Sequence, residues 1–139
     1  MSRRQAREAA LQALFQLDLN NSDGRDEAAE TRAVDAALEE GVLLPARDRD
    51  YVRDLVHGTN ANLEAIDALI TENSREWKVE RMSGIDRNVT RLAIYEMKFS
   101  PEKLTPNIVI NEAVELAKKF GTDDSSRFVN GVLGAMVKA

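Results

Sequence analysis

Three arginines near the start of the chain are the first side chains whose type and spacing indicate chemistry. Arg3, Arg4 and Arg7 stand against a single carboxylate, Glu8, within the first 17 residues, so this segment carries +2 although the whole chain carries −5. Guanidinium groups bind phosphate oxygens through paired hydrogen bonds, and the phosphates of RNA are the obvious ligand. A binding surface needs positive potential over only about 8 Å at physiological salt, so overall acidity does not exclude this chemistry.

A second candidate cluster lies between residues 123 and 128, where the sequence reads DDSSRF. Anionic, hydroxyl, cationic and aromatic groups within about one turn are suited to single-stranded RNA, through phosphate pairing and base stacking. Each group also has an ordinary structural explanation, because aspartates begin helices well and Phe128 fits an apolar face. For the arginines, the pattern alone favours a solvated helix end in which Arg4 pairs with Glu8.

The arginines belong to a predicted helix over residues 3–17, which Ser2 can cap. Its apolar stripe consists of Ala6, Ala10, Leu14 and Leu17. Arg3 and Arg7 are four residues apart and therefore share a face of this helix. Cations in the opening turns oppose the helix dipole, a cost that stability alone would not select. A function that requires positive charge would explain their position.

The second cluster forms the elbow of a predicted helical hairpin. Thr105 and Pro106 begin its first helix, and Gly121 is predicted to end it in the left-handed conformation that glycine adopts readily. Thr122 and Asp123 are candidate caps for the helix that follows. The apolar face of that helix consists of Phe128, Val129, Val132, Leu133, Met136 and Val137. Asn111 and Asn130 are interpreted as partly buried amides that join the hairpin by hydrogen bonds.

The central part of the chain also has helical periodicity. A short acidic helix is predicted from Asp26 to Glu40, followed by one helix from Leu44 to about Asn73 that would approach ~40 Å in length. Ser74 to Gly84 is a polar connection in which Trp77 is expected to anchor the two halves. Ser83 begins a further helix in a capping-box pattern, and that helix ends at a break before Pro101. No strand pattern competes, so we predict an all-α protein of six or seven helices.

Composition excludes several classes of function. The chain has no cysteine, and His57 is its only histidine, which is interpreted as a structural or surface residue. The sequence contains no glycine-rich phosphate loop and no nucleophile motif with a base. We therefore predict no enzymatic activity, no cofactor and no metal. A run of about 18 apolar residues and an apolar signal core are both absent, which predicts a cytoplasmic protein without membrane contact.

Three stretches carry a resemblance to a known family. INEAVELAKKFG at residues 110–121, followed by DDSSRFVNGVLG at 123–134, resembles the C-terminal signature of the NusB family of bacterial transcription antitermination factors. The resemblance extends to IDRNVTRLAIYEM at 85–97 and weakly to RRQAREAALQALFQL at 3–17. It implies a single NusB-like RNA-binding domain made of two three-helix bundles, an N-terminal subdomain at about 1–75 and a C-terminal subdomain at about 76–139.

The resemblance also implies a function and its partners. It implies a non-enzymatic factor that binds boxA RNA of nascent ribosomal RNA transcripts together with NusE, a small-subunit ribosomal protein, within the RNA polymerase antitermination complex. The RNA contacts implied are Arg3, Arg4, Arg7, Phe15, Phe120, Asp124, Arg127 and Phe128. Glu80 and Asp86 match acidic positions near the NusE contact surface. The charge pattern alone favours a solvated helix end for the three arginines, whereas the resemblance favours a role in RNA binding.

Two other interpretations remain open. The chain could be a helical protein-interaction module that forms a homodimer through its N-terminal helix, with the arginines facing acidic residues of a second copy. It could also be related to the N-terminal domain of RNA methyltransferases, in which case the catalytic part would have to be absent from this chain.

Overall fold

A computed structural model of the chain describes residues 3–19, 26–41, 43–74, 78–102 and 104–138. Every regular element within these ranges is helical, which confirms the all-α prediction: seven α-helices, one short 3-10 helix and one π-helical segment, with no strand among them. The chain divides into two compact units, Met1–Ala61 and Asn62–Ala139. Ser2 and Trp77, for which we predicted a cap and an anchor, lie outside the described residues. No helix within the described ranges has the length and apolar character needed to span a bilayer.

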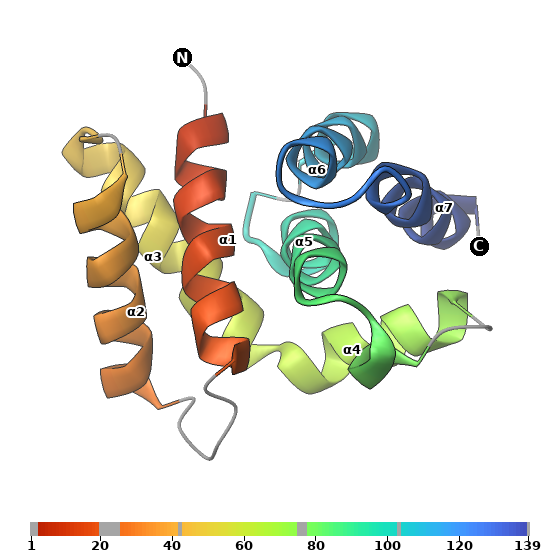
Figure 1. The fold of residues 1–139 in the computed structure, drawn as a ribbon, viewed down its shortest axis with the longest axis horizontal. Helices are drawn as coiled ribbons and strands as arrows, with labels where there is room; N and C mark the ends of the chain where they lie inside the picture. The colour runs from red at the N-terminus through yellow and green to blue at the C-terminus, as the bar shows by residue number, and fades with distance from the viewer. Residues whose placement is uncertain (1–2, 20–25, 42, 75–77, 103, 139) are drawn as a thin grey trace. The chain divides into compact units, whose positions relative to one another are not determined.

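The first unit is a three-helix bundle of α1 (Arg4–Leu19), α2 (Glu27–Glu40) and α3 (Ala46–Ala61), each packed against the other two (Figure 1). Asp26 is the N-cap of α2, because its carboxylate accepts a hydrogen bond from the backbone amide of Ala29 at 2.8 Å. Alanines on the inner faces, among them Ala10 and Ala13 with no exposed surface, allow the helix backbones to approach closely. The core of this unit is therefore aliphatic, as the low aromatic content requires.

The long helix that we predicted from Leu44 to Asn73 is two helices. The first, α3, ends at Ala61, and α4 (Leu63–Asn73) begins after Asn62, whose φ of −110° and ψ of 19° interrupt the helical backbone. Apolar residues keep their helical spacing on both sides of the break, because each helix packs into the core of its own unit. Leu55 of α3 is buried in the first unit and Ile66 of α4 is buried in the second. The compact units consequently divide before α4, whereas the sequence placed the division near residue 75.

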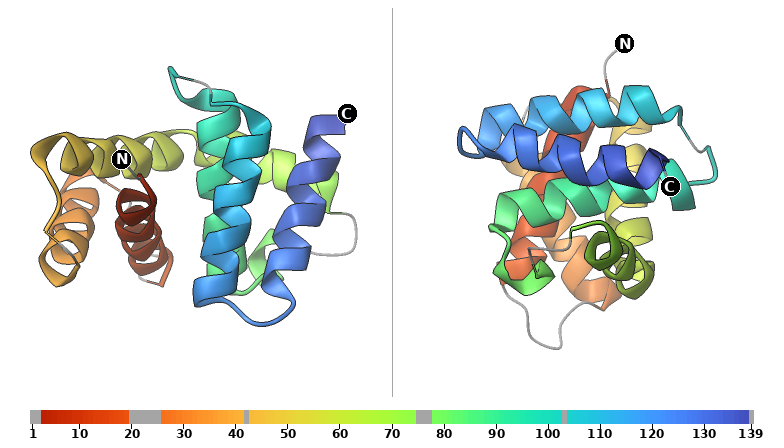
Figure 2. Two further views of the ribbon diagram at one scale, coloured as in Figure 1. Left: turned by 90° about the horizontal axis from the view of Figure 1, so that it is seen from above. Right: turned by 90° about the vertical axis from the view of Figure 1, so that its right-hand side faces the viewer.

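The second unit contains α4, a 3-10 turn η1 (Val79–Arg81), α5 (Gly84–Ile94), a π segment η2 (Tyr95–Phe99), α6 (Pro106–Phe120) and α7 (Ser125–Lys138). The last three α-helices pack against one another, and α4 packs on α5 and α7; α6 and α7 run antiparallel (Figure 2). The predicted cap of α5 is confirmed, because the Ser83 hydroxyl accepts the Asp86 amide at 3.1 Å.

The elbow between α6 and α7 depends on a glycine for a reason other than the one predicted. Gly121 has φ −101° and ψ −163°, which is extended backbone and not the left-handed conformation. A Cβ atom at this position would lie 2.6 Å from the Ser125 Cβ and 2.8 Å from the Ala117 carbonyl oxygen. Ser125 is 1% exposed and its hydroxyl accepts the Thr122 amide at 2.9 Å. Steric room therefore requires glycine here, because the elbow closes tightly on Ser125.

Candidate nucleic-acid interface

The three N-terminal arginines have different environments on α1. Arg4 is exposed, Arg3 is half-buried and Arg7 is 6% exposed. The guanidinium carbon of Arg3 lies 4.1 Å from the ring centroid of Tyr51 on α3, a cation–π contact that holds this side chain against the bundle. All three take part in further polar or ring contacts. Of the three, Arg4 presents the most surface to a ligand, and Arg3 is the one with a defined aromatic support.

Phe15 lies on the same face of α1 as Arg4. It follows Arg4 by three turns, so both side chains lie on one face of α1, separated by about 16 Å along the axis. Phe15 is half-buried, which leaves part of its ring accessible. In this unit the structure therefore brings one exposed cation and one accessible aromatic ring onto a common helix face.

The remaining four predicted RNA contacts gather at the elbow of the second unit. Phe120 is 43% exposed at the end of α6, and Phe128 is half-buried in the first turn of α7. The Asp124 and Arg127 side chains are 86% and 82% exposed and lie 3.4 Å apart. Such an exposed ion pair contributes less than about 1 kcal/mol to stability, so Arg127 can leave the Asp124 carboxylate and bind a phosphate at little cost in free energy.

Sequence reasoning missed two cations at the same elbow, Lys118 and Lys119. Both are exposed on the last turn of α6. The Lys119 ammonium lies 5.4 Å from the ring centroid of Phe120, and the Lys118 ammonium lies 3.7 Å from a Glu115 carboxylate oxygen. The available signal was the pair of lysines before Phe120 and Gly121 in the sequence. Together with Arg127 these lysines place three cations at the elbow, against the carboxylates of Glu115, Asp123 and Asp124.

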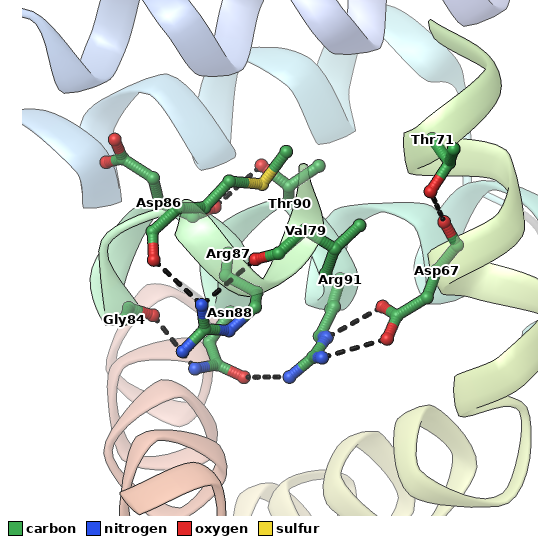
Figure 3. Close-up of polar contacts among 10 residues, drawn as sticks. Asp67, Thr71, Val79, Gly84, Asp86, Arg87, Asn88, Thr90 and Arg91 are labelled. Atoms are coloured by element: carbon green, nitrogen blue, oxygen red, sulfur yellow. Dashed lines mark hydrogen bonds and ion pairs between the residues drawn. The ribbon is translucent and has the colours of Figure 1, made fainter. Parts of the chain in front are cut away.

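The two predicted partner contacts lie on adjoining segments of the second unit. Glu80 is exposed on η1, and Asp86 is half-buried in the first turn of α5. One guanidinium nitrogen of Arg87 donates to the carbonyl oxygens of Val79 at 3.0 Å and Met82 at 2.7 Å, which ties η1 to α5 (Figure 3). The segment that carries Glu80 is therefore held in a defined position next to the start of α5.

A buried polar network that the sequence did not indicate holds α4 on α5. Arg91 donates to both carboxylate oxygens of Asp67, at 2.8 and 2.9 Å, and its third nitrogen lies 3.3 Å from the Asn88 amide oxygen (Figure 3). Asn88 in turn donates to the Gly84 carbonyl at 2.8 Å. The sequence places Asn88 and Arg91 three residues apart on α5, and that spacing did not identify Asp67 as their partner.

Other polar residues that we considered have simpler surroundings. His57 is exposed, and its Nδ1 lies 3.1 Å from a carboxylate oxygen of the buried Glu30. Asn111 and Asn130 are exposed, so the prediction that they are partly buried amides is wrong. Within the described ranges, no group of three or more histidine, cysteine, aspartate or glutamate residues could hold a metal ion. The features that stand out are therefore charged and aromatic surfaces.

The fold and these surfaces define a small all-helical protein with cationic and aromatic side chains exposed on both of its units. The NusB family model matches residues 4–138. A transcription antitermination protein NusB from Bdellovibrio bacteriovorus is 46% identical over 138 residues, covering 99% of this chain and 96% of that protein. Its counterpart from Desulforamulus reducens is 44% identical over 137 residues, covering 99% and 90%. The chain belongs to the NusB family.

Solved structures agree with this assignment. T. maritima NusB superposes with a TM-score of 0.85 at 35% identity, covering 99% of this chain and 92% of that one. A crystal structure of the antitermination factors NusB and NusE in complex with dsRNA gives a TM-score of 0.82 at 28% identity, covering 98% and 96%. The similarity therefore extends over both helical units.

Proposed function

We propose that this chain is a non-enzymatic transcription antitermination factor that binds boxA RNA of ribosomal RNA transcripts together with NusE. The observation that carries the proposal is full-length membership of the NusB family, combined with exposed cationic and aromatic groups at the positions matched to RNA contacts. Binding would place the factor, with NusE, in the cytoplasmic RNA polymerase complex that reads through terminators.

The exposed groups of each unit support RNA binding in physical terms. Arg4 and Arg127 are open to solvent, so each guanidinium can form charge-assisted hydrogen bonds to a phosphate. Phe120 has enough exposed ring for a base to stack on it, an interaction worth about 1–3 kcal/mol per base. Lys119 beside that ring adds positive charge where a phosphate would follow the stacked base. Arg7, which is 6% exposed, should contribute the least direct contact of the three N-terminal arginines.

Glu80 and Asp86 are proposed as contacts for NusE. A ribosomal protein that binds RNA is expected to be basic, and these carboxylates offer the opposite charge on two segments that Arg87 holds together. Charges at the rim of such an interface affect the association rate and partner choice more than the affinity. Glu80→Gln should therefore slow NusE association and reduce its dependence on salt, with a smaller change in the dissociation rate.

The test is RNA binding across a salt series. Fluorescence anisotropy would compare boxA RNA with a scrambled RNA, with and without NusE, for the wild-type protein, Arg4→Ala, Arg127→Ala and the control Arg32→Ala, which removes an exposed cation from α2. We expect boxA selectivity that NusE increases, and a salt slope reduced by about 0.7 for each phosphate that a variant no longer neutralises. The control should retain the wild-type slope.

Equal affinity for both RNAs, or equal slopes for all variants, would contradict the proposal. If boxA does not bind even with NusE present, the homodimer interpretation replaces it. In that case sedimentation equilibrium should reveal a dimer that is weakened by Arg4→Ala.

A further inference from the structure

The seam between α2 and α3 forms a groove on the first unit that the proposed RNA contacts do not use. These helices lie side by side (Figure 1). Glu27, Thr31 and Asp35 recur at four-residue spacing along α2, and Arg49, Arg53 and His57 recur in the same way along α3. Residues four apart occupy one helix face, so each set forms one wall of the groove.

Two adjoining hollows make up the groove. One has a volume of about 280 Å³ and an apolar floor of Val34 and Val56, and the other has a volume of about 440 Å³ and contains Leu38, Leu43 and Leu44. Asp35 and Arg53 line both hollows, so the two are continuous. Leu43 is 86% exposed, the largest value among the exposed large hydrophobic side chains of the described residues. A leucine left in water beside a hollow has apolar area to bury against a ligand.

The charge of the groove is mainly negative. Its walls hold four carboxylates, those of Glu27, Glu30, Asp35 and Glu39, against Arg49, Arg53 and a histidine. Arg53 already lies 3.1 Å from Asp50, and Glu30 lies 3.1 Å from His57. In the described part of the chain, no ion pair neutralises the other three carboxylates. Apart from the histidine, Arg49 is the one remaining cation in the walls to offset them.

We propose that this groove binds a basic amphipathic helix of a protein partner. The α2 wall from Glu27 to Leu38 is about 16 Å long, which matches three turns of a helix. A helix that packs in the seam of two others presents aliphatic side chains at i, i+3, i+4 and i+7 to the floor, and lysines or arginines on its flanks reach the acidic walls. RNA is disfavoured because its phosphates would face unpaired carboxylates. The proposal does not depend on RNA binding.

The probe is a fluorescein-labelled peptide of about fourteen residues, with leucines at i, i+3, i+4 and i+7 spacing and lysines elsewhere. Two control peptides keep the composition but scramble the order, or replace the lysines by glutamates. Amide chemical shifts of the full-length protein should change on α2 and α3 when the basic peptide is added. Both control peptides should bind about tenfold or more weakly, because one lacks an apolar face and the other repels the walls.

Variants test the apolar and the acidic parts of the groove separately. Leu43→Ser removes apolar surface, and Asp35→Lys with Glu39→Lys reverses charge in the groove; each should weaken peptide binding about tenfold. The matched control is Glu64→Lys with Glu72→Lys, which reverses two exposed charges on α4 and should leave the peptide affinity within about twofold. Circular dichroism spectra and thermal unfolding, measured in parallel, verify that each variant is folded.

Four results would overturn the proposal. One is an affinity that falls equally in the groove and control variants, which indicates attraction to overall negative charge. A second is an affinity that Leu43→Ser does not change. A third is chemical-shift changes that lie outside α2, α3 and the segment that joins them. The fourth is concentration-dependent dimerisation that Leu43→Ser abolishes, which would assign the groove to a second copy of the chain. Loss of RNA binding would affect only the function proposed above.

Discussion

The Asp67–Arg91 ion pair gives the sharpest expectation for stability because its two members differ in exposure. The Arg91 side chain is 7% exposed and the Asp67 side chain is 28% exposed, and two hydrogen bonds of 2.8 and 2.9 Å join them. Asp67→Ala leaves a buried guanidinium without its carboxylate, whereas Arg91→Met leaves a carboxylate that water can reach. Breaking a buried pair typically costs about 3–5 kcal/mol, and the partial exposure of Asp67 moves the expectation towards the lower end.

We therefore expect Asp67→Ala to lower the free energy of unfolding by about 3 kcal/mol and Arg91→Met by about 1–2 kcal/mol. Urea denaturation followed by circular dichroism measures both, with the midpoint interpreted at a constant m-value. Asp50→Ala is the matched control, because it breaks the exposed Asp50–Arg53 pair and should cost less than about 1 kcal/mol. For a chain of this size, a loss of about 3 kcal/mol corresponds to a fall in Tm of roughly 10 °C.

A greater loss of stability in Arg91→Met than in Asp67→Ala would refute this explanation, because the expected order follows from which partner is more deeply buried. A cost for Asp67→Ala as small as that of Asp50→Ala would show that the network contributes no more than a surface pair. In that case the packing of α4 on α5 would depend on Ile66 and Ile70, which have no exposed surface.

Three further outcomes follow from the elbow and from α1. Gly121→Ala should destabilise the protein by about 1–3 kcal/mol in thermal unfolding, whereas Gly131→Ala, which has open space around its Cβ position, should stabilise it by about 0.5–1 kcal/mol; equal effects would contradict the steric explanation. Asp124→Asn should tighten boxA binding severalfold at fixed salt, because it removes the anion beside Arg127; an unchanged or weaker affinity would count against that role. Tyr51→Leu should weaken RNA binding by about twofold to fivefold because Arg3 then loses its cation–π contact with the Tyr51 ring, and a double-mutant cycle with Arg3→Ala measures the coupling.

Local signals in the chain were enough to predict the class of fold and most helix ends. Pro106 begins α6, Ser83 caps α5 and α2 begins one residue after its predicted start at Asp26, each through a preference that involves only a few neighbouring residues. Periodicity likewise identified the apolar faces, because a helix repeats every 3.6 residues wherever it packs. The family resemblance rested on long matched stretches, and for that reason the full-length comparison could confirm it.

Local sequence signals could not predict the features that depend on which segments of the chain meet in space. The interruption at Asn62 does not disturb the apolar period, and it is understood only when Leu55 and Ile66 are found in separate cores. Gly121 is required because Ser125 closes on it, not because of its own backbone angles. Asp67 and Arg91 are 24 residues apart, and no local pattern pairs them.

For the candidate binding surfaces too, the sequence indicated which residues could bind RNA, and tertiary packing decided which of them are exposed. The family resemblance implied Arg4, Phe120 and Arg127 as RNA contacts, and the charge or aromatic character of each side chain suits that role. Packing then gave the three N-terminal arginines unequal exposure, with Arg7 enclosed. Exposure is a property of the folded chain, because it depends on the residues that surround a side chain, and most of these are distant in sequence.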